Sequence, residues 1–219
     1  MALSGAEHGT VIFADCQTAG KGRHGKAFFS PSGHGLYMSF ILRRFCFGAP
    51  LITAFAAVSV CEAIETISNK NPQIKWANDI FLNGKKICGI LAEAVLDFEN
   101  AQRIILGVGI NFNTPTTAFP ENLRQIAGAI YETDSPPATR SQLAAEIVNR
   151  VLFSDQREEE ILANYKKRMF MLGKPISVTG TAEAFEAVAV DIDNIGRLIV
   201  KKADGELLSL SAGEIQTEK

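Results

Sequence analysis

The most informative stretch for the architecture is Ile80-Phe-Leu-Asn-Gly-Lys-Lys-Ile-Cys-Gly-Ile-Leu-Ala92. Its centre, Asn83-Gly84, is the pair that two-residue β-turns favour, and apolar runs flank it, so the stretch predicts a β-hairpin. One helical pattern runs from Pro50 to about Ser68. Further apolar runs predict strands at Thr10–Ala14, Leu36–Leu42, Gln73–Trp76 and Arg103–Ile110. The class predicted is therefore α+β, with one mixed β-sheet flanked by helices.

The rest of the chain changes character after Asn113. Residues from Ser141 to about Met171 predict a helix, with Ser141 as its N-cap, and Gly173-Lys174-Pro175 ends it. Short strands separated by turns follow, which is typical of a small β-barrel. These strands are predicted at Ile176–Val178, Phe185–Asp191, Arg197–Lys201 and Glu206–Leu210. We predict two domains, at residues 1–171 and 172–219.

Composition limits the classes of function. The 219 residues carry a net charge of −2 and are 47% hydrophobic, so we expect a soluble globular protein that binds no nucleic acid. The longest apolar stretch, Ala49–Val60, is too short to span a bilayer, and Met1–Gly5 has no signal-peptide features. Free thiols are expected at all four cysteines (Cys16, Cys46, Cys61 and Cys88), which lack metal-ligand spacing. Together these features predict a cytoplasmic location.

A glycine-rich basic loop, Gly20-Lys-Gly-Arg-His-Gly-Lys26, is the first segment that could carry chemistry. Its glycines let backbone N–H groups approach a ligand, and its cations can neutralise a phosphate or a carboxylate. The spacing matches neither the P-loop nor the dinucleotide-binding motif. A solvated surface loop is an equally good interpretation. Phe28, just after the loop, suits either a core or a platform for adenine.

Two later segments add polar groups at strand ends. In Lys75-Trp-Ala-Asn-Asp79, the lysine, amide and carboxylate suit metal-bound phosphates, with Asp79 as a Mg²⁺ ligand. The alternative is a solvated turn. In Gly107-Val-Gly-Ile-Asn111, the glycines indicate close backbone approach, and Asn111 suits the edge of a purine. Tight packing of that strand is the alternative. None of the three histidines has a spacing that indicates a catalytic triad or a zinc site.

Taken in order, these segments resemble the biotin–protein ligases. The resemblance extends over almost the whole chain and implies the class II synthetase-like, biotin–lipoate ligase fold. We find no N-terminal helix-turn-helix segment, as in the family's non-repressor type. The matching residues are Gln17–Lys26, Phe29-Ser-Pro31, Gly35–Ser39, Lys75–Asp79, Lys86–Glu93, Gly107–Asn111 and, in the C-terminal barrel, Ala212–Ile215.

The resemblance also implies roles for individual residues. Lys86, Arg23 and Asp79 would be catalytic, and Asp79 would hold Mg²⁺. The residues implied in biotin binding are Gln17, Lys21, Gly22, Arg23, Lys86, Gly89 and Leu91. Those implied in ATP binding are Arg23, Lys26, Phe28, Lys75, Asn78 and Asn111.

The activity implied is activation of biotin with ATP to biotinyl-5′-AMP, followed by transfer to a lysine of a carboxylase carrier domain. The resemblance does not decide between a monomer and a homodimer. There are departures: Ala77, Lys21 and Phe28 replace a proline, an arginine and a tryptophan, and Glu218 lies where an arginine is common. The family's first strand and helix, with a Ser/Thr-Thr-Asn biotin contact, are expected to be missing. Two alternatives follow: a lipoate or octanoate ligase of the same fold, or a non-catalytic protein that binds biotin or nucleotide.

Overall fold

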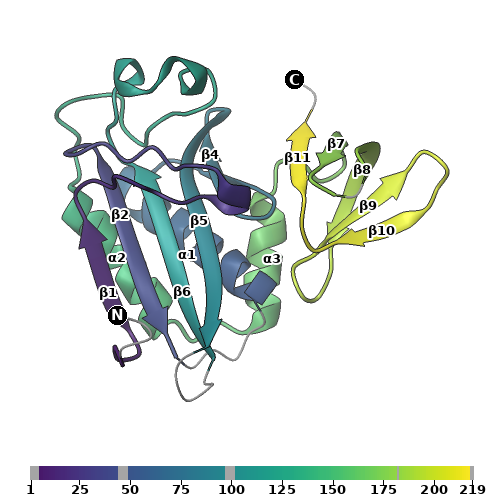
Figure 1. The fold of residues 1–219 in the computed structure, drawn as a ribbon, viewed down its shortest axis with the longest axis horizontal. Helices are drawn as coiled ribbons and strands as arrows, with labels where there is room; N and C mark the ends of the chain where they lie inside the picture. Colours follow the sequence, from purple (N-terminus) through teal and green to yellow (C-terminus); the bar gives the residue numbers. More distant parts are fainter. Residues whose placement is uncertain (1–4, 44–48, 97–101, 182, 218–219) are drawn as a thin grey trace.

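The computed structural model describes residues 5–43, 49–96, 102–181 and 183–217. Of the sequence predictions, those on Cys46 and Glu218 lie outside these residues. Two β-sheets organise the described chain, a large one in the N-terminal part and a small one at the C-terminus (Figure 1). The chain passes from one to the other around Leu172, where we propose the domain boundary.

The large sheet has the strand order β1-β2-β6-β5-β4-β3. Its strands are β1 (Thr10–Ala14), β2 (Gly35–Leu42), β3 (Gln73–Lys75), β4 (Asp79–Leu82), β5 (Lys85–Leu96) and β6 (Gln102–Asn111). All of the predicted strands are present. Every pair of these strands is antiparallel, and parallel pairing in the described chain is confined to isolated bridges, Ile74–Met169 and Lys86–Ala127. Antiparallel order follows from the tight connections, such as the Asn83-Gly84 turn, since parallel strands need long crossovers.

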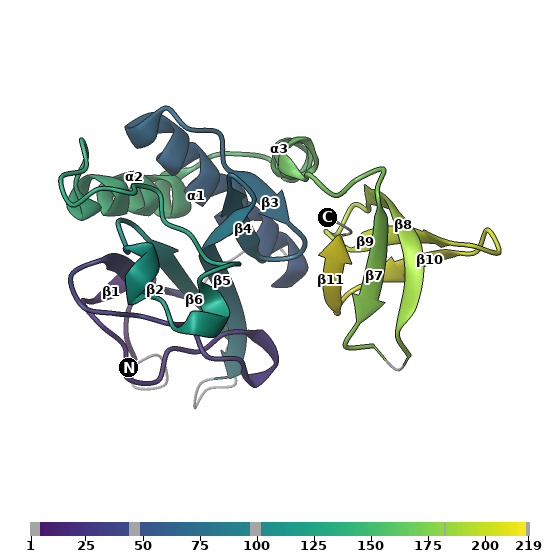
Figure 2. The same ribbon diagram turned by 90° about the horizontal axis from the view of Figure 1, so that it is seen from above.

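Helices cover one face of the large sheet and leave the other face to loops (Figure 2). They are α1 (Ala49–Ser68), α2 (Arg140–Phe153) and α3 (Glu158–Arg168). The apolar stretch of α1 is longer than predicted: residues 51–68 are long and apolar enough to cross a membrane. However, 67% of that window is buried inside the protein, as in the core helix of a soluble domain.

The single helix predicted from Ser141 to Met171 is two helices, separated by residues 154–157. Thr139, not Ser141, is the N-cap of α2. Its hydroxyl accepts a hydrogen bond from the Gln142 amide at 3.2 Å, and the Gln142 carboxamide accepts one from the Thr139 amide at 2.8 Å. The break lies where the Ser154 hydroxyl accepts from the backbone of Gln156, a local bond that competes with helix formation.

The small sheet has the order β10-β9-β8-β7-β11. Its strands are β7 (Pro175–Thr179), β8 (Phe185–Ile192), β9 (Leu198–Lys202), β10 (Leu207–Leu210) and β11 (Glu214–Thr217). β10 and β11 do not pair in the described residues, so the sheet is open there and not a closed barrel. β11 was not predicted as a strand. Among the contacts that join this sheet to the large part, Trp76 Nε1 donates to the Gly196 carbonyl at 3.1 Å, and Lys166 pairs with Asp191 at 2.9 Å.

A β-bulge in β5 sets the direction of its side chains. Cys88 pairs with Ile80 and Lys86 with Phe81, so Ile87 is an extra residue on β5. Ile87 and Cys88 are both fully buried in the core. The alternation of faces therefore shifts at the bulge, and Lys86 emerges on the same face as Gly89, away from the helices.

Tyr165 on α3 supports the turn that leads into β4. Its hydroxyl is buried and donates to the Ala77 carbonyl at 2.6 Å. We expect Tyr165→Phe to lower the free energy of unfolding by about 1–2 kcal/mol, because a buried carbonyl loses its donor. Urea unfolding measures this. Tyr131→Phe is the control, since its 3.2 Å bond to the Ile67 carbonyl is longer, and its loss should be smaller. Equal losses would contradict the assignment.

Candidate functional site

The basic loop forms a hydrogen-bonded hairpin, here called the basic tongue (residues 20–28). Gly22 N donates to the Lys26 carbonyl at 2.6 Å, and Phe28 N donates to the Gly20 carbonyl at 2.8 Å. Figure 1 shows the tongue crossing the face of the large sheet that the helices leave free. The loop is therefore ordered by its own backbone.

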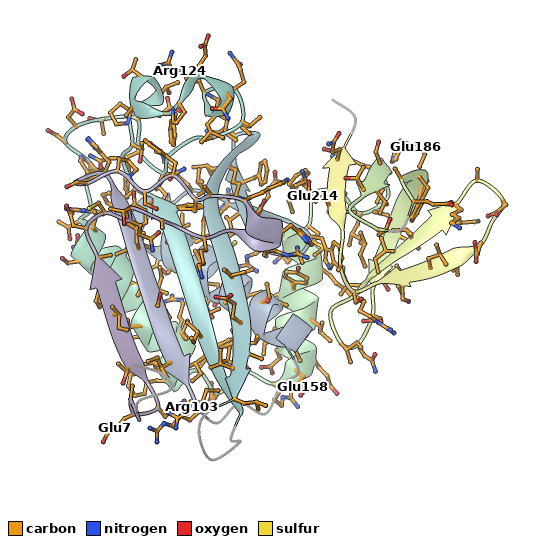
Figure 3. The ribbon with its side chains drawn as sticks, viewed as in Figure 1. Glu7, Arg103, Arg124, Glu158, Glu186 and Glu214 are labelled. Carbon is orange, nitrogen blue, oxygen red and sulfur yellow. The ribbon has the colours of Figure 1, made fainter. Side chains whose placement is uncertain are left out.

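The tip of the basic tongue is anchored at two places. Arg23 Nη1 donates to Asn78 Oδ1 at 3.1 Å, and Asn78 Nδ2 in turn donates to the Ile90 carbonyl at 2.7 Å. Lys26 Nζ pairs with Glu214 Oε2 at 2.6 Å, and Figure 3 shows Glu214 on β11, turned toward the tongue. The hydrogen bond from Lys26 holds the pKa of Glu214 below its usual value. The C-terminal sheet thus helps to hold the tongue.

Two glycines form the floor beneath the return strand of the tongue. Gly89 on β5 pairs with Gly109 on β6, and the Phe28 ring lies on both. A Cβ on Gly109 would lie 2.6 Å from that ring, and one on Gly89 would lie 3.2 Å from it. The Tyr37 ring packs against the Phe28 ring in an edge-to-face arrangement, with the two ring centroids 6.4 Å apart. The tongue can lie on the sheet because these positions have no side chains.

A cleft of about 670 Å³ opens between the basic tongue and β5. The tongue supplies one wall and Leu91 and Glu93 on β5 supply the other. Its lining residues are Ala19, Gly20, Lys21, Gly22, Arg23, His24, Gly25, Lys26, Ala27, Leu91 and Glu93. The tongue wall therefore carries cations and backbone N–H groups, which favours an anionic ligand.

Charged side chains cluster where β3, β4 and β5 meet. Lys86 Nζ lies 2.7 Å from Asp79 Oδ1 as an ion pair, although this oxygen accepts no aligned hydrogen bond from the described residues. Lys75 lies close by, with its ammonium 5.7 Å from the centre of the Phe81 ring. Burial is the main cause that lowers the pKa of Lys75, and the nearby Lys86 contributes to the lowering. The cluster combines cations with one carboxylate.

Asn111 lies at the end of β6. It is next to residues 126–128, whose backbone is hydrogen-bonded to that of Lys86. Its Nδ2 donates to the Gly128 carbonyl at 2.9 Å. Its Oδ1 is buried and has no hydrogen-bond partner among the described residues. Ile126 and Gly128 also bond the backbone of Lys86, so Asn111 and Lys86 share one support. An unpaired buried acceptor is costly, so it indicates a donor from outside the chain.

Most of the predicted site residues fall into three places. The cleft is lined by Lys21, Gly22, Arg23, Lys26 and Leu91, whereas Lys75, Asp79 and Lys86 form the charged cluster, and Asn111 lies at the sheet end. Gln17 is elsewhere: its Oε1 accepts from Ser30 at 2.8 Å, and it does not line the cleft. The individual roles of these residues stay predictions.

Two residues of the site were given no role by the sequence. Glu93 lines the cleft, and period-two alternation from Leu91 could have found it. Glu214 reaches Lys26 from 188 positions away, and no local signal marks such a contact. Neither Cys61 nor Cys88 belongs to the site. Both are buried free thiols whose pKa is raised by burial, and Cys16 is an exposed free thiol.

The fold and this site define an α+β protein with a cation-lined cleft under a basic tongue. The comparisons with known proteins name the family. The model of the biotin/lipoate A/B protein ligase family matches residues 1–111, and that of the biotin protein ligase C-terminal domain matches residues 171–217. The chain belongs to the biotin/lipoate A/B protein ligase family.

Among the curated relatives, the bifunctional ligase/repressor BirA of Bacillus spizizenii is 30% identical over 94% of this chain. The chain spans 65% of the length of that relative. The biotin–[acetyl-CoA-carboxylase] ligase of Mycobacterium tuberculosis is 27% identical, over 98% of this chain and 81% of the relative. A solved structure of the biotin protein ligase from Aquifex aeolicus, in complex with biotin and ATP, aligns with a TM-score of 0.82. Its identity is 26%, over 98% of this chain and 91% of that one.

Gly109 and Gly107 provide a matched pair of substitutions. A Cβ at Gly109 would collide with the Phe28 ring at 2.6 Å, whereas one at Gly107 meets the Leu91 carbonyl at an ordinary 3.6 Å. We expect Gly109→Ala to lower the free energy of unfolding by about 1–3 kcal/mol, because the ring must move. Gly107→Ala should leave it nearly unchanged. Thermal unfolding of both variants tests this, and equal effects would show that Phe28 does not rest on Gly109.

The Lys26–Glu214 pair should protect the basic tongue from proteolysis. We expect Glu214→Ala to raise the rate of tryptic cleavage at Lys21, Arg23 or Lys26 several-fold, because one anchor of the tip is lost. Glu206→Ala is the control, since Glu206 pairs with Lys202 within the small sheet. Mass spectrometry of the early fragments measures the rates. Unchanged cleavage in the Glu214 variant would contradict an anchoring role.

Proposed function

We propose that the protein is a biotin–protein ligase, which activates biotin with ATP to biotinyl-5′-AMP and transfers biotin to a lysine of a carboxylase carrier domain. One observation carries this proposal: a member of this family has a cation-lined cleft between its basic tongue and β5, the strand that also carries Lys86 of the Lys86–Asp79 pair. The Aquifex aeolicus neighbour, solved with biotin and ATP, supports the choice of both small molecules.

Biotin is favoured over lipoate by the C-terminal part of the chain. The family model of the N-terminal part covers both biotin and lipoate ligases, so it does not decide between them. The second matching model, over residues 171–217, describes a domain of biotin protein ligases. In this structure that domain supplies Glu214 to the tip of the basic tongue. The same domain therefore supports both the family assignment and the cleft.

The first step requires positive charge, because a carboxylate must approach a polyphosphate of the same sign. In the proposed reaction a biotin carboxylate oxygen bonds to the α-phosphorus of ATP, and the bond to the pyrophosphate oxygen breaks. Lys86 faces this region from β5, and Arg23 faces it from the tongue. Their charges would stabilise the negative charge that develops in the transition state.

Asp79 is the residue that would hold Mg²⁺. The described residues contain no group of three or more acidic, histidine or cysteine side chains that could hold a metal alone. Mg²⁺ commonly binds through one or two carboxylates together with substrate phosphates, so a single aspartate fits. Bound there, it would neutralise phosphate charge. Lys75, the third member of the cluster, would contact phosphate oxygens.

At the nucleotide end, Asn111 would read adenine. Its unpaired Oδ1 can accept the hydrogen bond that the exocyclic amine of adenine donates. Lys26, Asn78 and Phe28 were assigned to the same nucleotide from the resemblance. In this structure Lys26 is paired with Glu214, and Asn78 accepts a hydrogen bond from Arg23. The Phe28 ring lies on the glycine floor. Their binding to ATP therefore requires an exchange of partners.

The second step transfers the biotinyl group to the carrier. The lysine amine attacks the carbonyl carbon of the mixed anhydride, a C–N bond forms, and AMP leaves with the bonding electrons. Until then the basic tongue would shield the anhydride from hydrolysis. Gln17, Gly89 and the tongue amides of Lys21 and Gly22 would complete biotin binding. We further propose that the protein acts in the cytoplasm, in keeping with its free thiols.

Pyrophosphate release tests this function directly. Purified protein with biotin, Mg²⁺ and ATP should release pyrophosphate in a biotin-dependent manner. We expect Lys86→Ala to lower the rate at least about 100-fold, because one positive charge at the point of attack is lost.

Lys85→Ala is the matched control, since Lys85 is adjacent in sequence but lines a separate cavity of about 230 Å³ near Gly128. It should retain most of the activity. Lipoate and octanoate replace biotin in parallel reactions. No release with biotin, at micromolar enzyme, would refute the proposal, and faster release with lipoate would replace it by the related lipoate activity.

A further inference from the structure

The turn that joins β3 to β4 carries two members of the charged cluster at its ends. Lys75 and Asp79 are paired across it, and the turn itself consists of residues 76–78. Asp79 Oδ1 is buried and accepts no aligned hydrogen bond from the described residues, although it forms the ion pair with Lys86. Apart from that ion pair, the orientation of this carboxylate therefore depends on the backbone of the turn.

Three hydrogen bonds hold the turn from outside the large sheet. Trp76 N donates to Met171 Sδ at 3.3 Å, and the Tyr165 hydroxyl donates to the Ala77 carbonyl at 2.6 Å. These two partners belong to α3 and to the segment that follows it. The third bond, from Trp76 Nε1 to the Gly196 carbonyl at 3.1 Å, comes from the small sheet, 120 positions further along the chain. Two parts of the protein thus fix the turn.

Apolar packing alone does not explain the bond between Trp76 and Gly196. The Trp76 side chain belongs to the main apolar core and is only 4% exposed, a place that phenylalanine or leucine could also fill. Tryptophan adds an N–H group, which needs an acceptor once water is excluded. Gly196 presents its carbonyl from the turn between β8 and β9. The indole N–H therefore specifies where the small sheet lies relative to the β3–β4 turn.

The turn between β8 and β9 is itself held by a dense set of hydrogen bonds. Asp193 Oδ1 accepts from Ile195 N at 3.1 Å and from Arg197 N at 2.9 Å. Arg197 Nε donates to Asp193 Oδ2 at 2.6 Å, and Gly196 N donates to the Asp193 carbonyl at 3.1 Å. Gly196 has a φ of +86°, which favours glycine. The Gly196 carbonyl is therefore an acceptor of well-defined position.

We propose that Trp76 is a positioning residue for Asp79: through Gly196, the small sheet fixes the β3–β4 turn in the conformation in which Asp79 holds a phosphate-bound cation. The inference rests on the proposed function and concerns a side chain that acts through its neighbours on the chain. Small errors in the placement of a ligand-binding group lower affinity, so loss of this bond should affect the metal–nucleotide complex. Biotin, which is proposed to bind beside the tongue, should be affected little.

Calorimetry on the full chain, with ATP and Mg²⁺ together and with biotin alone, tests the proposal. We expect Trp76→Phe to weaken binding of Mg²⁺–ATP about 5- to 20-fold, because the turn loses a buried hydrogen bond while the ring still fills the core. Biotin affinity should change by less than about twofold. Lys166→Ala is the matched control, since its 2.9 Å pair with Asp191 also joins the small sheet to the large part but involves neither turn. It should bind Mg²⁺–ATP as the unsubstituted protein does.

A second pair of variants changes the acceptor side and leaves Trp76 intact. Asp193→Ala removes the side-chain acceptor that orders the turn around Gly196, so it should weaken Mg²⁺–ATP binding several-fold. Asp193→Asn keeps an oxygen at the same place and should retain most of the affinity. This difference separates positioning through Gly196 from a general effect of substitutions in the small sheet.

A spectroscopic measurement covers the case in which Trp76→Phe does not fold. Trp76 is the only tryptophan of the sequence, so its indole N–H gives a single signal in a ¹H–¹⁵N spectrum of the unsubstituted protein. The signal should shift when Mg²⁺–ATP is added and should stay in place with biotin alone. Asp193→Ala should move it in the free protein, because the acceptor is displaced.

Several results would overturn the positioning role while the ligase proposal stands. They are an unchanged affinity of Trp76→Phe for Mg²⁺–ATP, an equal loss in Lys166→Ala, and a parallel loss of biotin affinity in Trp76→Phe. An indole signal that does not respond to Mg²⁺–ATP has the same consequence. If the unsubstituted protein binds neither biotin nor ATP, the ligase proposal itself fails, and the role of Trp76 fails with it.

Discussion

The close contact between the Phe28 ring and the paired glycines, Gly89 and Gly109, is the constraint on which the site depends. A methyl group at Gly109 would lie 2.6 Å from the ring, so no other residue lets the return strand of the basic tongue lie this close to the sheet. That approach brings the tip over the sheet as far as Asn78 and Glu214. The cleft is the space that remains beside Phe28, between the tongue and β5.

The second constraint is the bulge at Ile87. In a regular strand, Lys86 would lie on the same face as Cys88, inside the core, where an unpaired ammonium is very costly. The extra residue is apolar and fully buried, so the core gains about 1.5–3 kcal/mol from it while the lysine turns to the open face. The Lys86–Asp79 pair therefore results from apolar packing on the opposite side of the sheet.

Local patterns in the sequence predicted most of the fold. Asn83-Gly84 gave the hairpin, and Asn83 and Gly84 both have the positive φ that such a turn requires. The predictions were less accurate where neighbouring residues compete for the same structural role. Thr139 caps α2 in place of Ser141 because Gln142 completes a capping box only with Thr139. For the site, motifs identified the tongue and the charged cluster. The Lys26–Glu214 contact depends on how two sheets pack, and neither residue's local sequence contains that information.

The bonds that hold the basic tongue in this structure affect the free energy of ligand binding. Its backbone bonds and two anchors hold it without a ligand, so folding has already met the entropic cost of ordering it. A ligand that enters the cleft then loses less binding free energy to loop ordering. The anchors also commit Arg23 and Lys26 to partners outside the cleft. An anionic ligand must compete for these cations, so its charge, more than its apolar surface, decides whether the tip leaves Asn78 and Glu214.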